Sequence, residues 1–126
     1  MPSHVVARVP GKINLQLSVG PLQRDGYHPV ATVFQAVSIF DDVKVAFSSQ
    51  AGITILSGGK PSDYLPLDKN NLAYKAAELM MKKFDITDRL EITLTKEIPI
   101  AGGMAGGSAD AGATIVAIDS LFGLGL

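Results

Sequence analysis

Residues 98–114 (IPIAGGMAGGSADAGAT) combine five glycines with a serine between an alternating apolar segment and a helix-like one. Glycines let a backbone approach an anion without Cβ collisions and adopt positive φ. The N–H groups and dipole of the following helix favour negative charge. Ser108 is placed to cap that helix, bind a phosphate oxygen or contact Mg2+. The pattern predicts a phosphate-binding loop, and the alternative is a connection whose glycines only permit close packing.

Two common phosphate-binding motifs are excluded by residues in this stretch. The P-loop requires a lysine immediately before the serine, whereas Gly107 directly precedes Ser108. The dinucleotide fingerprint requires a second glycine where Met104 stands. A loop without its own lysine therefore needs positive charge from a bound metal or from a distant lysine if it holds a triphosphate.

Lys12 lies in a segment, KINLQLSV (12–19), that alternates strictly between polar and apolar residues. The alternation predicts a half-buried strand, with Ile13, Leu15, Leu17 and Val19 on one face and Lys12, Asn14, Gln16 and Ser18 on the other. A cation beside Asn14 is suited to steering a hydroxyl or stabilising charge on a transferred phosphoryl group. The alternative is a solvated lysine on an edge strand.

Strand-like segments dominate the first half of the chain. Strands are predicted over 4–9, 12–19, 32–40, 42–47 and 52–56, with Asp25-Gly26 as the turn of a hairpin. A helix follows, capped by Asp68 and buried through Leu72, Ala76, Leu79 and Met80. A strand over 90–95 and a second helix, with Ala111, Ile115, Ile118 and Phe122 at helical spacing, complete the order. This order predicts an α+β domain with a mostly antiparallel or mixed sheet.

Composition narrows the class of protein. The 126 residues are 47% hydrophobic and 18% charged, which is typical of a globular domain. Eleven basic against twelve acidic residues argue against a general nucleic-acid binder. With no cysteine, no signal peptide and no long apolar run, the chain is expected to be cytoplasmic, without a membrane partner. The apolar end at Leu121, Phe122, Leu124 and Leu126 leads us to expect a continuation that covers it.

The segment 99–109 resembles the P-x-x-x-G-L-G-S-S motif of the GHMP kinases (galactokinase, homoserine kinase, mevalonate kinase and relatives). The blocks VPGKINLQL (9–17), RDGYHPVATVFQAV (24–37) and LPLDKNNLAYKAAELM (65–80) resemble members acting on a cytidine-diphosphate-linked methylerythritol. The resemblance implies ATP-dependent phosphorylation of a hydroxyl. It also implies an N-terminal domain over 1–126 similar to ribosomal protein S5 domain 2, with helices on one face of the sheet and the second domain absent.

The resemblance implies roles for individual residues. Lys12 matches the active-site lysine, and Ser108 is a candidate Mg2+ ligand. The positions implied to bind ATP are Asn71, Lys96, Pro99, Ile100, Ala101, Gly102, Gly103, Met104, Ala105, Gly106, Gly107, Ser108 and Ala109. The positions implied to bind the substrate are Asn14, Tyr27, His28 and Phe34. The alternatives are a core Phe34, a solvated turn at Tyr27-His28, a first-turn polar residue at Asn71 and a solvated strand end at Lys96.

The general base of the family is an aspartate in a later segment that this sequence does not contain. Asp110 and Asp119 both fit an ordinary helix, with Asp110 expected in the favourable first turn. The 126 residues alone are therefore expected to be inactive or nearly so. Two alternatives stay open: another GHMP kinase with a different alcohol substrate, and a non-catalytic nucleotide-binding module.

Overall fold

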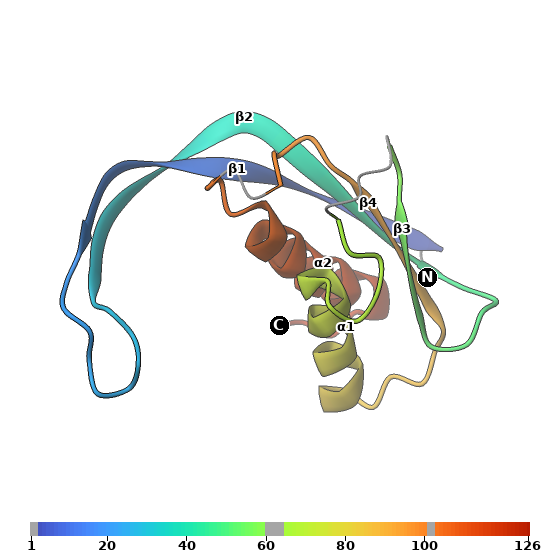
Figure 1. Cartoon of the computed structure of the whole chain (residues 1–126). Helices are drawn as coiled ribbons and strands as arrows, with labels where there is room; N and C mark the ends of the chain where they lie inside the picture. Colours follow the sequence, from blue (N-terminus) through green and yellow to red (C-terminus); the bar gives the residue numbers. More distant parts are fainter. Residues whose placement is uncertain (1–2, 60–64, 101–102) are drawn as a thin grey trace.

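The computed structural model describes residues 3–59, 65–100 and 103–126, which form one mixed sheet and two helices (Figure 1). The elements are β1 (His4–Val19), β2 (Val30–Phe47), β3 (Ile53–Ser57), α1 (Leu72–Lys83), β4 (Leu90–Thr95) and α2 (Gly106–Phe122). The sheet order is β1-β2-β4-β3. The pairs β1/β2 and β2/β4 are antiparallel, whereas β3/β4 is parallel. The predicted α+β class with a mixed sheet is confirmed.

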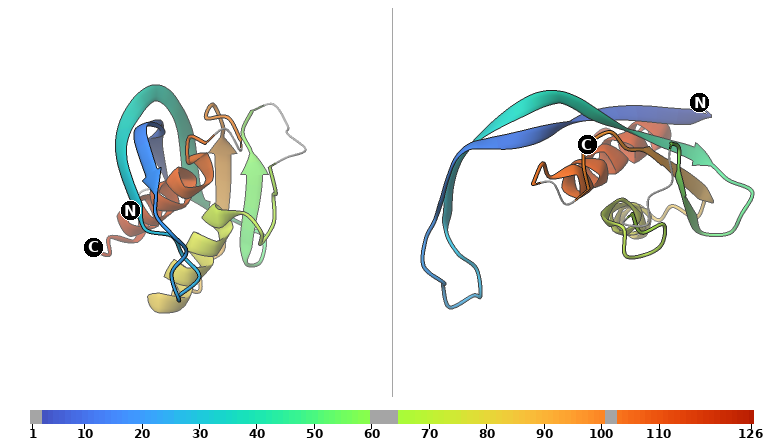
Figure 2. Two further views of the ribbon diagram at one scale, coloured as in Figure 1. Left: turned by 60° about the vertical axis from the view of Figure 1, so that its left-hand side comes forward. Right: turned by 45° about the horizontal axis from the view of Figure 1, so that its top comes forward.

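Both helices cover the same face of the sheet (Figure 2). The central strands supply the fully buried side chains Val43, Val45, Leu90, Ile92 and Leu94. They pack against Ala73 and Ala77 of α1 and against Ala117, Ile118 and Leu121 of α2. Burial of each large apolar side chain stabilises the fold by about 1.5–3 kcal/mol. This core fixes the starts of α1 and α2 relative to the end of β4.

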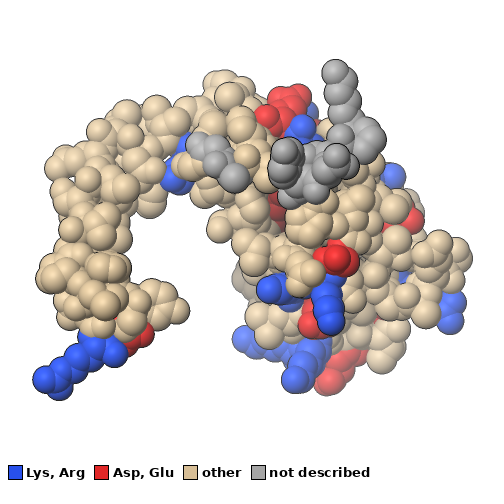
Figure 3. Space-filling view, viewed as in Figure 1, with Lys and Arg blue, Asp and Glu red and all other residues tan. Residues whose placement is uncertain are grey.

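The strands β1 and β2 continue far beyond the helices as a curved hairpin arm, residues 13–36 (Figure 1). Its expected apolar face is exposed: Leu15 and Val19 each retain 61% of their accessible surface. The prediction of a half-buried strand over 12–19 is therefore wrong for the described residues, because neither helix reaches beneath the arm. Arg24 and Asp25 are the only lysine, arginine, aspartate or glutamate residues of the arm, and they lie at its tip (Figure 3).

The predicted strand breaks at Pro10-Gly11 and at Asp41 lie within continuous strands. Pro10 pairs with Phe40, but Lys12 pairs with Ala36, so the register shifts between them. The structure thus has two long strands where four shorter ones were expected. Such irregularities bend a strand without ending it, and this one lies where the arm leaves the helix-covered part of the sheet.

The helix starts also differ from expectation. Asn71, not Asp68, caps α1: its side chain accepts a hydrogen bond from the Ala73 N–H at 2.9 Å. Asp68 instead accepts from the Asn70 N–H in the preceding turn, at 2.8 Å. An Asn side chain satisfies the free N–H groups of a first turn as well as Asp does. The Asp68 side chain is therefore used in the turn before α1, and Asn71 is the residue that caps the helix.

The buried faces of the two helices are rotated from the predicted ones. The buried residues of α1 are Ala73, Ala76, Ala77 and Met80, whereas Leu72 and Leu79 are exposed. The buried face of α2 includes Ala113, Ala117, Ile118 and Leu121, and Ile115 is partly exposed. Small alanines face the sheet because they allow close approach. Within the described residues, neither helix has the length and hydropathy required to cross a membrane.

Candidate functional site

A cavity of about 420 Å³ opens where β4, α1 and α2 meet. Lys96 and Asp110 lie in it together with Asn71 at the start of α1. The remaining lining comes from the loop before α1 and from the glycine-rich segment: Leu65, Pro66, Asn70, Leu72, Pro99, Ile100, Gly103, Ala105, Gly106, Gly107 and Ser108. Most of the predicted ATP-binding residues thus line this cavity.

The N-terminus of α2 faces the cavity without a side-chain cap. Ala105 is the N-cap residue in the left-handed conformation (φ 57°, ψ 31°), and its side chain makes no capping hydrogen bond. The first N–H groups of a helix lack intrahelical partners. Gly106, Gly107 and Ser108 line the cavity, and the N-terminus of a helix is an environment that favours anions.

Lys96 joins two buried aspartates beneath this helix start. Its Nζ donates to Asp41 Oδ2 at 2.5 Å and to Asp110 Oδ2 at 2.8 Å. Asp41 Oδ1 also accepts from the backbone N–H groups of Glu97 and Ile98, both at 2.9 Å. Asp41 therefore ties β2 to the segment that leads from β4 into the glycines. The other oxygen of Asp110, Oδ1, is buried and has no partner among the described residues.

The two carboxyl groups of this cluster have opposite protonation preferences. Burial and the neighbouring Asp41 raise the pKa of Asp110 to about 7, against the lowering effect of Lys96. Burial also opposes the charged form of Asp41, but the neighbouring Asp110 carboxyl, the Lys96 ammonium and two backbone N–H groups outweigh it, and the pKa of Asp41 is lowered. Burial lowers the pKa of Lys96, and the two carboxylates more than compensate, so that pKa is raised.

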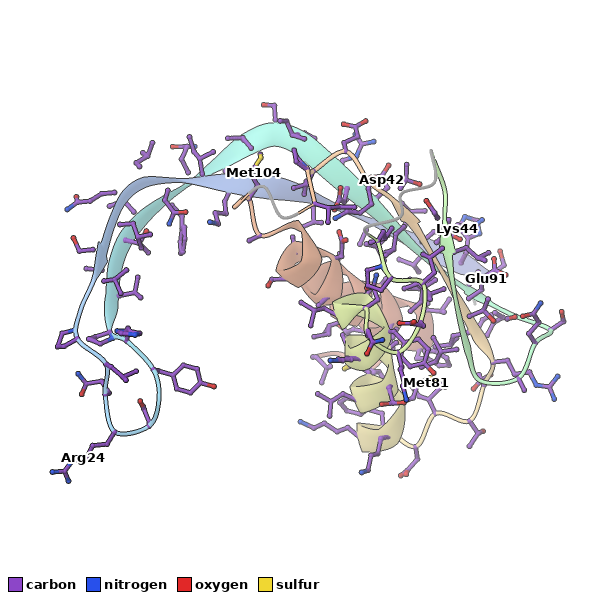
Figure 4. All side chains as sticks on the ribbon, viewed as in Figure 1. Arg24, Asp42, Lys44, Met81, Glu91 and Met104 are labelled. Carbon is purple, nitrogen blue, oxygen red and sulfur yellow. The ribbon has the colours of Figure 1, made fainter. Side chains whose placement is uncertain are left out.

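Lys12 lies against the glycine-rich loop rather than in open solvent. Its Nζ donates to Gly103 O at 2.7 Å and to Asn14 Oδ1 at 2.6 Å. Its backbone N–H donates to Met104 O at 3.2 Å. The preceding Gly11 is buried, and a Cβ there would lie 3.1 Å from Met104 Cε. Met104 accordingly lies beside β1 (Figure 4). The absence of a side chain at Gly11 lets the loop dock beside Lys12.

The predicted substrate residues are divided along the hairpin arm. The Phe34 ring is exposed, with its centroid 5.4 Å from Lys12 Nζ, so it is not a core residue. Tyr27 and His28 are exposed and closely follow Arg24, which lies at the tip of the arm, away from α1 and α2 (Figure 4). His28 Nδ1 lies 2.8 Å from Gly20 O. Because a carbonyl only accepts, Nδ1 carries the proton in this contact.

Two predicted loop residues have other contacts, and two cannot be placed. Met104 packs toward Gly11, and the Ala109 N–H donates within α2 to Ala105 O at 2.9 Å. Ala101 and Gly102 lie outside the described residues. Lys96 is half-buried and paired, so it is not a solvated strand end.

Known proteins share both the sequence of the cavity-lining segment and the fold of this chain. The profile described as GHMP kinases N terminal domain matches residues 71–126, which include α1, β4, the glycines and α2. A crystal structure of 4-(cytidine 5'-diphospho)-2C-methyl-D-erythritol kinase superposes with a TM-score of 0.76 at 32% identity. It covers 97% of this chain and 42% of that one. Residues 71–126 thus match this family, and the fold of the chain is that of a GHMP kinase N-terminal domain.

Further known proteins share the fold or the sequence of this chain to differing degrees. Homoserine kinase from Cytophaga hutchinsonii superposes with a TM-score of 0.74 at 22% identity, covering 100% of this chain and 38% of that one, which shows the fold alone. The curated 4-diphosphocytidyl-2-C-methyl-D-erythritol kinases of Mycolicibacterium smegmatis and Leifsonia xyli are 50% and 47% identical over 97% and 94% of this chain. The chain spans only 37% and 39% of those two relatives.

Asp41 and Asp110 are the site residues that sequence reasoning missed in this GHMP domain. Asp110 lies beyond the first turn of α2, in which there is no acidic residue, so the helix dipole does not explain it. Its position four residues after Gly106 places it on the buried face, where a lone carboxylate requires a partner. Asp41 gave no signal, since its partners are 55 and more residues distant in sequence.

The site fits phosphate groups better than it fits a metal bound by protein alone. The uncapped start of α2 offers N–H donors to an anion. Within the described residues, no group of three histidine, aspartate or glutamate side chains is placed to hold a metal ion. Mg2+ usually binds through one or two protein ligands together with substrate phosphates. Ser108, exposed at the cavity, therefore stays a proposed ligand only.

Substituting Gly106 by alanine is expected to lower the free energy of unfolding by about 1 kcal/mol, through overpacking. A Cβ at Gly106 would lie 3.0 Å from both Lys96 Nζ and Ile98 Cγ2. The matched control is Gly112→Ala in the same helix, where a Cβ meets nothing within 4 Å. It should stabilise the domain by about 0.5–1 kcal/mol because alanine favours helix. Urea unfolding measures both, and equal effects of the two substitutions would contradict the close packing at Gly106.

Substituting Asp110 by asparagine is expected to change how stability depends on pH. The pKa of Asp110 is raised to about 7 in the fold, against about 4 in an unfolded chain. The native state thus binds this proton more tightly, and the contribution of Asp110 to stability declines as pH rises from about 4 to about 7. Relative to Asp110→Asn, the unsubstituted protein should lose stability across that window. The pKa of Asp41 is lowered, so protonation of Asp41 affects stability only at pH values below this window. Urea unfolding at four pH values measures the difference, and parallel curves would refute the assignment.

Proposed function

We propose that the protein containing this chain is an ATP-dependent 4-diphosphocytidyl-2-C-methyl-D-erythritol kinase. It would phosphorylate the 2-hydroxyl of that alcohol in the non-mevalonate route to isoprenoid precursors, in the cytoplasm. The observation that carries the proposal is 50% identity, over 97% of this chain, to a curated kinase of that name. In this proposal residues 1–126 form the N-terminal, ATP-binding part of the enzyme.

The uncapped end of α2 supports a place for the ATP phosphates. The N–H groups of Gly106, Gly107 and Ser108 would donate to phosphate oxygens, and the helix dipole would stabilise their charge. Asn71 at the start of α1 and Leu65 in the preceding loop also line the cavity and would face the adenosine. Lys96 is held below the loop by two carboxylates, so its role would be to neutralise them beside a polyanion.

Lys12 would act at the transferred group. Its Nζ is anchored to Gly103 O at the edge of the phosphate-binding loop. There it would stabilise the negative charge that develops in phosphoryl transfer and orient the attacking hydroxyl. The proton of that hydroxyl requires a base, and none of the residues placed at this site has that role in our proposal.

The hairpin arm supports the proposed recognition of the cytidine end. Phe34 exposes an aromatic ring next to Lys12, and Tyr27 exposes one at the arm tip. Aromatic rings of this kind stack on pyrimidines. His28 uses Nδ1 to bind Gly20 O, which leaves Nε2 for a hydrogen bond to a ligand. A substrate that extends from the tip of the arm toward Lys12 would contact Tyr27 at one end and Phe34 at the other.

Competition between alcohols tests the proposal. The full-length protein is incubated with labelled ATP and equal concentrations of 4-diphosphocytidyl-2-C-methyl-D-erythritol, mevalonate and homoserine, and the phosphorylated products are separated. We expect label in the cytidine-linked alcohol alone. Label in mevalonate or homoserine would assign the protein to another activity of the family, and ATP binding without any product would indicate a non-catalytic module.

A further inference from the structure

We propose that Thr32 is a positioning residue for this kinase reaction. Its hydroxyl sets the orientation of the Asn14 amide, and through that amide it holds the Lys12 ammonium at the edge of the glycine-rich loop. The inference rests on the proposed function, because it assumes that Lys12 contacts the reacting groups. Lys12 and Asn14 lie two residues apart on β1, whereas Thr32 comes from the neighbouring strand β2.

A continuous series of hydrogen bonds links Thr32 to the loop. Thr32 Oγ1 donates to Gln16 O at 2.7 Å and accepts from Asn14 Nδ2 at 2.8 Å. Asn14 Oδ1 accepts from Lys12 Nζ at 2.6 Å. The same Nζ donates to Gly103 O at 2.7 Å. Each side chain between Thr32 and the loop is therefore bound on both sides.

The single proton of the Thr32 hydroxyl gives this series a direction. A hydroxyl has one proton, and a carbonyl can only accept. The proton is donated to Gln16 O, so Oγ1 must accept from Asn14, which turns Nδ2 toward Thr32 and Oδ1 toward Lys12. A flipped amide would place two N–H donors against an ammonium group. The Thr32 hydroxyl thus selects the amide orientation that binds Lys12.

A strand irregularity places Thr32 within reach of Gln16. Asn14 pairs with Phe34, but Gln16 pairs with the next residue, Val33, so β1 carries one extra residue at Leu15. The alternation predicted over 12–19 is broken there. Bulges of this kind re-aim side chains and are frequent beside active sites. The hydrogen bond from Thr32 to Gln16 O stabilises this bulge, which lies directly after Asn14.

The ammonium group is left with one proton for a ligand. Two of the three Nζ protons are donated to Asn14 and Gly103. The position of the third is then determined by the first two. Without the Thr32 hydroxyl the amide of Asn14 rotates, and Lys12 keeps only Gly103 as a fixed acceptor. A misplacement of about 1 Å at a reacting group can reduce the rate about a hundredfold.

The test compares Thr32→Val, which keeps the shape and removes the hydroxyl, with Thr32→Ser, which keeps the hydroxyl. In the full-length protein we expect Thr32→Val to lower kcat about tenfold to a hundredfold, with the KM for ATP nearly unchanged. Thr32→Ser should recover most of that loss. Thr54→Val is the matched control, since Thr54 also donates a side-chain hydrogen bond, to Gln50, but on β3 at the opposite edge of the sheet. It should not change kcat.

A double substitution tests whether Thr32 acts through Asn14. If it does, Thr32→Val adds no further loss of kcat to Asn14→Ala, whereas independent sites give additive losses. The relay is contradicted by additive losses, by equal losses for the Val and Ser variants, or by a Thr32→Val variant that melts earlier but keeps its kcat.

A spectroscopic measurement separates this inference from the proposed function. With ¹⁵N-asparagine labelling, the side-chain amide of Asn14, assigned by its absence in Asn14→Ala, should shift in Thr32→Val and not in Thr32→Ser. If the unsubstituted protein lacks the proposed kinase activity, the proposed function fails, and the amide shift alone decides whether the relay exists. An Asn14 amide that is the same in all three proteins would overturn it.

Discussion

Replacing Lys12 by alanine in the full-length protein is expected to lower kcat by about a hundredfold to a thousandfold, the usual effect of removing one charge-stabilising donor from an active site. The free energy of unfolding should fall by only about 1 kcal/mol. The reason is that Lys12 is only partly buried and its Nζ makes two hydrogen bonds, to Asn14 Oδ1 and Gly103 O. Steady-state kinetics and urea unfolding on the same preparation measure the two effects.

A surface lysine provides the control for this substitution. Lys44 is exposed on β2, on the face of the sheet opposite the two helices (Figure 4). Lys44→Ala changes the net charge equally and should leave kcat unchanged. A Lys12→Ala variant that loses activity only in proportion to its loss of stability would make Lys12 a structural residue.

Replacing Asp41 by alanine should destabilise the domain by about 3–5 kcal/mol, the usual effect of removing one partner from a buried ion pair. Asp41 is fully buried and binds three donors: the Lys96 ammonium and the backbone N–H groups of Glu97 and Ile98. Its loss leaves the two backbone N–H groups without this acceptor and leaves Lys96 with Asp110 as its remaining partner. Thermal or urea unfolding measures the effect.

The next residue in sequence is the matched control for Asp41. Asp42 pairs with Arg8, at 2.9 Å between Nε and Oδ1, but both side chains remain accessible to solvent. Exposed ion pairs contribute little to stability, so Asp42→Ala should change the free energy of unfolding far less than Asp41→Ala. Similar losses of stability for the two substitutions would mean that the buried cluster does not hold β2 against the segment that follows β4.

The glycine loop could be predicted from sequence because its determinants are local. Gly106, Gly107 and Ser108 stand between an alternating strand and a helical repeat, and the structure places them at the uncapped start of α2. The strand over 90–95 was predictable for the same reason, since Leu90, Ile92 and Leu94 alternate and are all buried. The positions of this strand and of the glycine segment could thus be predicted because both depend on adjacent residues.

Features that depend on distant partners could not be predicted. The alternation over 12–19 correctly indicates a strand, but burial depends on a second layer, which the described residues do not place under the arm. Whether Pro10-Gly11 ends or bends β1 depends on its pairing with β2. The buried ion-pair cluster joins three separate segments of the chain, at Asp41, Lys96 and Asp110. No local sequence pattern predicts such a cluster.

The position of the nucleotide phosphates tests the account most directly. A crystal structure of the full-length protein with a non-hydrolysable ATP analogue should show phosphate oxygens within about 3 Å of the N–H groups at Gly106, Gly107 and Ser108. Lys12 Nζ should remain on Gly103 O and point its third proton toward the terminal phosphate. Phosphates bound elsewhere, with the start of α2 left to solvent, would contradict the proposed site.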